Sequence, residues 1–210
     1  MRCAVQGVIL WMALAGLVDS PPESAAEYVS RGMQQFRENK IAESIRDFDR
    51  AAQLDPQTAP YLWQRGISDY YAGKFQEGRR QFESHKAVNP DDVENAAWHF
   101  LCVARTDGLD AARKALIRID LSRDPRVPMA EVYQFYAGKG SEAAVLEAAT
   151  RADTEHARMY AHLYLGLFYE AAGDAHKARA HISRAALANV QKDYMHDVAK
   201  IHLLQRKWDR

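Results

Sequence analysis

The chain lacks most of the features that mark a dedicated enzyme or a nucleic-acid-binding protein. Its 210 residues include only 2 cysteines, and its charge is balanced, because 28 lysines and arginines offset 28 aspartates and glutamates. Tight binding to nucleic acid rests largely on neutralising phosphates, so a chain without net positive charge is poorly suited to it. The sequence also contains no glycine-rich phosphate loop, no Gly-x-Ser-x-Gly elbow and no His-Glu-x-x-His helix. We therefore expect no nucleic-acid partner and no catalytic activity.

Cysteine and histidine form no recognisable reactive or metal-binding pattern. Cys102 follows His99 by three residues, which places both on one helix face. A pair on one helix leaves little room for a substrate, so we interpret Cys102 as a buried structural cysteine and keep a thiolate nucleophile as the alternative. Histidine pairs such as His176 and His181 are five or six residues apart, whereas ligands on one helix face are three or four apart. No metal site and no cofactor are expected.

Residues 1–20 differ in composition from the rest of the chain. Arg2 precedes an uncharged apolar run over residues 8–18, which is shorter than the about 20 residues of a transmembrane helix. Ala13-Leu14-Ala15 fits a signal-peptidase site, and Leu17 stands where a lipoprotein box requires cysteine. These features predict a cleaved signal peptide and an exported, non-lipidated protein, periplasmic or secreted. The alternatives are a membrane anchor formed by the uncleaved segment and a buried first helix.

A repeat with a period of 34 residues organises the remaining chain. Shifting residues 59–90 by this period aligns five pairs: Arg65 with Arg31, Gly66 with Gly32, Tyr70 with Phe36, Phe82 with Phe48, and Pro90 with Pro56. Each unit contains two apolar runs at helical spacing, and the closing proline prevents the second helix from continuing. This pattern resembles the tetratricopeptide repeat (TPR). We expect an all-α solenoid of antiparallel helix pairs.

The expected repeats span residues 25–58, 59–92, 93–126, 127–158 and 159–190, and a capping helix lies within 191–210. Ser24 and Glu27 have the spacing of a capping box, so the first helix should begin at Ala25. The third and fourth repeats are degenerate. In the third, we expect the second helix to include Leu116 and Ile119. The last helix is expected to cover the otherwise exposed face of the final repeat.

Two stretches resemble the bacterial new-lipoprotein-I family more specifically than a generic repeat. Residues 61–101 contain RGISDYYAGK, NPDD and WHFL, and residues 162–204 contain LYLGLFYEAAGD, followed by Tyr194 and His196. Members of that family are exported, anchored TPR adaptors, often dimeric, which bind cell-wall hydrolases and a processing protease. The resemblance implies an adaptor linked to the cell envelope and allows for a homodimer. This chain departs from the family in the missing lipoprotein cysteine and in having one fewer N-terminal helix pair.

The concave face of the expected solenoid is the candidate binding site. In TPR proteins, which this chain resembles, the first helix of each repeat lines that face. Aromatic side chains flanked by arginines are typical of peptide-binding hot spots. The candidate partner-binding residues are Met33, Phe36, Arg37, Trp63, Ile67, Tyr70, Tyr71, Leu101 and Arg105. The alternative is that Trp63 and Tyr70 only pack between repeats.

The sequence thus predicts a non-catalytic scaffold or adaptor that binds a protein or peptide in its concave groove. A structural or self-associating subunit, whose groove is filled by its own N-terminal segment, is the alternative function.

Overall fold

The part of the chain that the computed structural model describes, residues 24–209, is built from helices with no strand. Its elements are α1 (Ala25–Arg37), α2 (Ile41–Leu54), the 3-10 helix η1 (Pro56–Tyr61), α3 (Trp63–Tyr71), α4 (Phe75–His85), α5 (Val93–Asp107), α6 (Leu109–Ala115), the 3-10 helix η2 (Leu121–Arg123), α7 (Met129–Tyr136), α8 (Glu142–Ala152), α9 (Glu155–Ala171), α10 (Ala175–Ala186) and α11 (Tyr194–Arg206). The all-α prediction is confirmed. The expected signal peptide, residues 1–20, lies outside the described residues.

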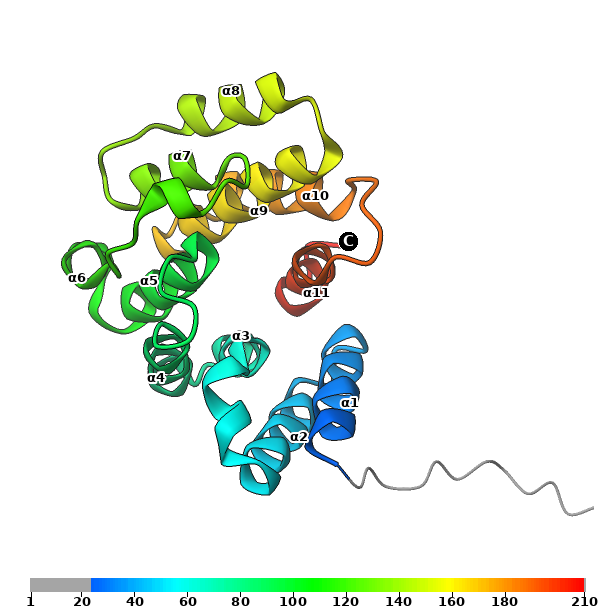
Figure 1. Ribbon diagram of the computed structural model, residues 1–210. Helices are drawn as coiled ribbons and strands as arrows, with labels where there is room; N and C mark the ends of the chain where they lie inside the picture. Colours follow the sequence, from blue (N-terminus) through cyan, green and yellow to red (C-terminus); the bar gives the residue numbers. More distant parts are fainter. Residues whose placement is uncertain (1–23, 210) are drawn as a thin grey trace, which may run out of the picture.

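Helices that follow one another in sequence pack as adjacent pairs (Figure 1). The turns within two of these pairs use Gly73 and Gly173, whose φ angles of +74° and +83° lie in the left-handed region. Glycine adopts this region without steric cost, which explains why it stands at the tight turns. At the start of α1, the Ser24 and Glu27 side chains form the expected capping box, and the helix begins at Ala25.

Glycines let the two helices of a pair approach closely. A Cβ atom added at Gly66 in α3 would lie 2.7 Å from the Phe82 ring of α4. Gly32 in α1 faces Phe48 of α2 in the same way, at 3.1 Å. Each glycine leaves the space that an aromatic ring of the partner helix fills. The two glycine–phenylalanine pairs, which are 34 residues apart, therefore occupy equivalent positions in successive helix pairs.

The prediction for the second helix of the third repeat is wrong beyond Ala115. α6 ends there, and Leu116 has the extended backbone angles φ −54° and ψ 123°. Tertiary hydrogen bonds engage the backbone that follows: the Tyr133 hydroxyl donates to the Ile117 carbonyl at 3.1 Å, and the Asp120 N–H donates to the Asp91 carboxylate at 2.9 Å. These contacts with distant segments outweigh the local helical pattern that included Leu116 and Ile119.

The C-terminal helix α11 does more than extend the row of pairs. It packs against α10, as a cap would, but it also contacts α9 and α1. Figure 1 shows α11 lying between the first helix pair and the α9–α10 pair. Its buried side chains are distributed around the helix: Met195, His196, Val198, Ala199, Ile201 and His202. α11, the last helix, therefore connects the first helix pair to the α9–α10 pair.

Candidate functional site

The first turn of α11 covers part of the predicted groove. The Tyr194 ring stacks on Phe36 with the ring centroids 5.3 Å apart, and it meets Trp63 edge-on at 5.2 Å. The Arg37 Nε donates to the Asp197 carboxylate at 2.7 Å, so this rim arginine already has an acidic partner within the chain. The predicted aromatic residues Phe36 and Trp63 thus both contact a helix of the same chain.

The Glu170 carboxylate in α9 contacts two more of the predicted partner-binding residues, Tyr70 and Arg105. The Tyr70 hydroxyl donates to its carboxylate at 3.3 Å, and the Arg105 guanidinium approaches it at 3.5 Å. Arg206, in the last turn of α11, forms an ion pair with the same carboxylate. Tyr70 and Arg105 therefore face a charged cluster that ties α3, α5, α9 and α11 together.

Tyr71 forms a buried hydrogen bond with α11. Its hydroxyl lies 3.0 Å from Nδ1 of His202, a residue with no solvent exposure. Desolvation by burial lowers the pKa of His202 to about 4. The imidazole is therefore neutral near pH 7, so its Nδ1 accepts the tyrosine proton when Nε2 carries the ring proton.

The other predicted residues have packing roles in this structure. Ile67 and Leu101 are fully buried, and half-buried Met33 packs beside Phe48 and Leu62. The segment that covers part of the predicted groove is the C-terminal α11. The N-terminal segment was the one expected to fill it under the alternative function, and its residues 1–23 lie outside the described part. Partner binding by these residues stays a prediction.

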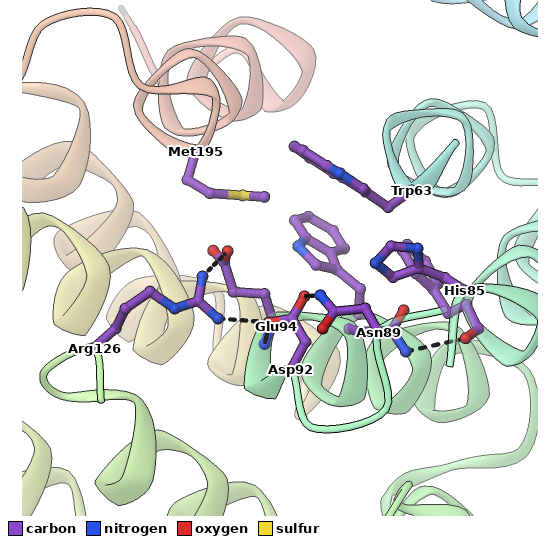
Figure 2. Close-up of a pocket in the computed structure, with 10 residues that line it drawn as sticks. Trp63, His85, Asn89, Asp92, Glu94, Arg126 and Met195 are labelled. Atoms are coloured by element: carbon purple, nitrogen blue, oxygen red, sulfur yellow. Dashed lines mark hydrogen bonds and ion pairs between the residues drawn. The ribbon is translucent and has the colours of Figure 1, made fainter. Parts of the chain in front are cut away.

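Trp63 differs from the others because it also lines a cavity, which we call the Trp63 cavity. It has a volume of about 260 Å³ and lies between α3, the end of α4, the start of α5 and the first turn of α11. Figure 2 shows Trp63 and Met195 on the side of the cavity opposite Asp92 and Asn89. The lining residues are Trp63, Phe82, His85, Asn89, Asp92, Glu94, Asn95, Trp98, Arg126 and Met195.

One edge of the cavity is a network of acidic side chains around Arg126. Its guanidinium binds Asp92 and Asp124, each at 2.6 Å, and also Glu94. The Tyr164 hydroxyl donates to the second oxygen of Glu94 at 2.8 Å. Desolvation by burial raises the pKa of Glu94 to about 7, even though Arg126 favours the carboxylate.

Two buried polar atoms of cavity residues have no hydrogen-bond partner among the described residues. They are the indole Nε1 of Trp98 and the side-chain Oδ1 of Asn95, and these residues are only 1% and 4% exposed. The Asn95 Nδ2 donates to the Phe82 carbonyl at 3.0 Å, which fixes the orientation of the amide. Buried polar groups are usually paired, so both atoms would gain a hydrogen bond from a ligand or water that reached them. Each has less than 1 Å² of accessible surface, so such a contact requires a small movement of the cavity lining.

Sequence reasoning missed most of this cavity. Trp98 and Asn95 occur in α5 among core residues, where nothing in their spacing distinguishes them from packing residues. Arg126 reaches Asp92 from 34 positions away. That pairing depends on how α5 and the segment after η2 fold together, which a local pattern does not encode.

The other candidate chemistry is inaccessible or incomplete in the described part of the chain. Cys102 has no solvent exposure, and burial raises the pKa of its thiol well above the usual value. His99 turns its Nε2 toward Glu83 at 3.3 Å. Between residues 24 and 209, no group of three or more histidine, cysteine or acidic side chains could hold a metal ion. No helix in the same range is long and apolar enough to cross a membrane.

No protein-family model matches this chain.

Proposed function

We propose that this protein is a non-catalytic TPR-type scaffold that binds a peptide segment of a protein partner at the Trp63 cavity. The 34-residue repeat and the packing of glycine against phenylalanine in successive helix pairs support a TPR solenoid. A solenoid of this kind is a rigid support for a binding surface, so its function depends on the site it presents.

The observation that carries the proposal is the combination of aromatic walls with unpaired polar atoms in one cavity. α11 covers Phe36 and Tyr71, while the cavity beside Trp63 retains about 260 Å³ of free space. An anchor side chain entering this space would contact two tryptophans, and the peptide could pair with Trp98 Nε1 and Asn95 Oδ1. Binding hot spots are enriched in such desolvated aromatic positions.

The resemblance to the new-lipoprotein-I family supports an exported adaptor that works in the cell envelope. Its partner would then be an envelope protein. N-terminal sequencing of the native protein tests export: a start near Gly16 is expected, and an intact Met1 or Arg2 would contradict it.

A structural or self-associating subunit is the second candidate function. The observation that favours it is α11 itself, whose Tyr194 ring stacks on Phe36, a residue with no exposed surface. Under this alternative, the repeat surface stabilises the chain's own fold and needs no external peptide.

Affinity capture with matched variants separates the two functions. Tagged protein is expressed in its native cells, and the co-eluting proteins are compared for wild type, Trp63→Ala and Tyr61→Ala. Tyr61 is a suitable control because it lies two residues away and is 60% exposed outside the cavity lining. Loss of one defined partner with Trp63→Ala alone, at a melting temperature that shows the variant is folded, supports the proposal. Retention of every partner by folded Trp63→Ala would favour the structural subunit.

A further inference from the structure

We infer that the Trp63 cavity receives a basic side chain, lysine or arginine, of the bound peptide. This inference rests on the proposed function and specifies the partner's anchor residue. Its basis is the combination of an excess of acidic side chains, aromatic walls and unpaired hydrogen-bonding atoms at one place.

The network at the cavity edge has more acidic than basic side chains. Asp92, Glu94 and Asp124 share a single guanidinium, that of Arg126. Arg126 uses Nη2 for both aspartates, Nη1 for Glu94 and Nε for Asp124. Four of its five N–H groups are therefore engaged by three acidic side chains, of which Asp92 and Glu94 line the cavity. Because burial raises the pKa of Glu94 to about 7, this carboxyl is partly protonated near pH 7, and a cation in the cavity would favour its ionised form. An entering cation would offset the excess of acidic side chains, whereas an acidic side chain would add to it.

The walls favour a cation for a second, independent reason. Trp63, Trp98 and Phe82 all line the cavity, and the Trp98 and Phe82 rings stack with an interplanar angle of 19°. The faces of aromatic rings attract a guanidinium or ammonium group, and tryptophan does so most strongly. Burial of the ring edges in the protein removes competing water, which increases this attraction.

The polar atoms of the lining can complete the hydrogen bonds of a basic residue. Asn95 Oδ1 is an unpaired acceptor suited to a guanidinium or ammonium N–H. His85 donates from Nδ1 to the Pro60 carbonyl at 2.8 Å, since a carbonyl can only accept, which fixes the orientation of this lining side chain. The Trp98 N–H needs an acceptor, which the carbonyl of a peptide backbone supplies. A purely apolar anchor would leave the Asn95 and Trp98 groups unpaired.

The net charge of the chain does not explain a preference for basic peptides. The chain carries 28 basic and 28 acidic side chains, so it has no net field that would attract basic peptides to any surface. A measured preference for a basic anchor residue would therefore come from a local site, and variants of the cavity test whether it is that site.

The test uses the full chain and four immobilised peptide libraries that differ only at one central position. That position is arginine, lysine, citrulline or norleucine, and the flanking positions are randomised without charged residues. We expect the arginine and lysine libraries to bind about tenfold more tightly than the neutral ones, which corresponds to about 1.4 kcal/mol of binding free energy. Glu94→Gln should abolish most of this preference. Glu147→Gln, which removes an exposed carboxylate on α8, should retain it.

A second measurement locates the binding and does not depend on the Glu94 variant being stable. In ¹⁵N-labelled wild-type protein, the arginine peptides should shift the indole N–H resonance of Trp98, assigned with Trp98→Phe. Equal binding of all four libraries, with the Trp98 shift, would overturn the basic-anchor inference and leave the proposed peptide site intact. Binding of no library, or binding without a Trp98 shift, would overturn the proposed site as well.

Discussion

At the scale of single residues, Gly66 shows how one missing side chain sets the distance between two helices. The Phe82 ring is 1% exposed and lies where a Cβ of residue 66 would project, at 2.7 Å. We predict that Gly66→Leu overpacks this crossing and lowers the free energy of unfolding by about 1–3 kcal/mol. Urea denaturation monitored by circular dichroism measures the change.

Ala180→Leu is the matched control, because it adds the same side chain to an exposed position of α10. It should alter the free energy of unfolding by less than about 0.5 kcal/mol. Equal stability of Gly66→Leu and wild type would mean that α3 and α4 do not cross at Gly66.

His202 is a second residue whose surroundings make a measurable prediction. Its ring is fully buried between Tyr71, the Glu170–Arg206 pair and Trp208, and burial lowers its pKa from 6.5 to about 4. The folded protein therefore binds this proton less tightly than the unfolded chain. The stability due to neutral His202 is fully present above pH 6.5 and is lost as the pH falls toward 4.

The expected loss from His202 alone between pH 7 and pH 5 is about 2 kcal/mol, at 1.36 kcal/mol for each pKa unit. Urea denaturation at both pH values should show a smaller loss for His202→Gln than for wild type. An NMR titration of the imidazole provides the direct check. A midpoint for His202 near 6.5 in the folded protein would contradict the prediction.

At the scale of elements, α11 is held to α1 and α3 mainly by aromatic packing. Tyr194 contacts both Phe36 and Trp63, whereas the Arg37–Asp197 pair lies at the surface, with the two side chains 39% and 26% exposed. We predict that Tyr194→Ala lowers the free energy of unfolding by about 2–4 kcal/mol, because it removes a large packed ring. Arg37→Ala should cost less than about 1 kcal/mol, as exposed ion pairs usually do.

A double-mutant cycle with Arg37→Ala and Asp197→Ala checks this ranking. Its coupling energy should lie between about 0.2 and 1 kcal/mol. A coupling energy above that range, or a Tyr194→Ala variant as stable as wild type, would show that charge and not packing anchors α11.

The helix pairs could be predicted from the sequence because their signals are local. Ser24 begins α1, Gly73 forms the turn between α3 and α4, and Gly32 and Gly66 lie inside their helices where the partner helix crosses. The path of α11 could not be predicted in this way. Its apolar positions indicated a cap, but contacts such as Arg37 with Asp197 join residues 160 positions apart.

The candidate site was likewise predictable only where its residues follow a local sequence pattern. The sequence predicted Trp63 as a partner-binding residue from its position in the repeat, and it lines the cavity, while partner binding stays a prediction. The sequence did not identify Glu94, Asn95 or Trp98, because their roles depend on which cavity they face and which hydrogen bonds they lack. Unpaired buried atoms become visible only after all partners have been placed in three dimensions.

At the scale of the whole molecule, α11 changes how stability is shared along the chain. In an open repeat array, each unit contacts only its neighbours, so the terminal pair can unfold by itself. Here Gln205 donates to Asn39 at 2.6 Å, and Tyr194 stacks on Phe36, so the first helix pair is attached to the last helix of the chain. α11 also packs against α10 and α9, which extends the connection to the final pair.

This closure predicts that the two ends of the described chain unfold together. In native-state hydrogen exchange, the most protected amides of α1 and α9 should open with the same free energy, and that value should equal the global free energy of unfolding. Tyr194→Ala should break the equality: α1 and α2 should exchange through a smaller opening, while α9 and α10 should keep the protection that their own packing provides. Ala180→Leu should leave the equality intact. If α1 of the wild-type protein already exchanged through its own low-energy opening, α11 would only lie against the first pair without coupling it to the rest of the fold.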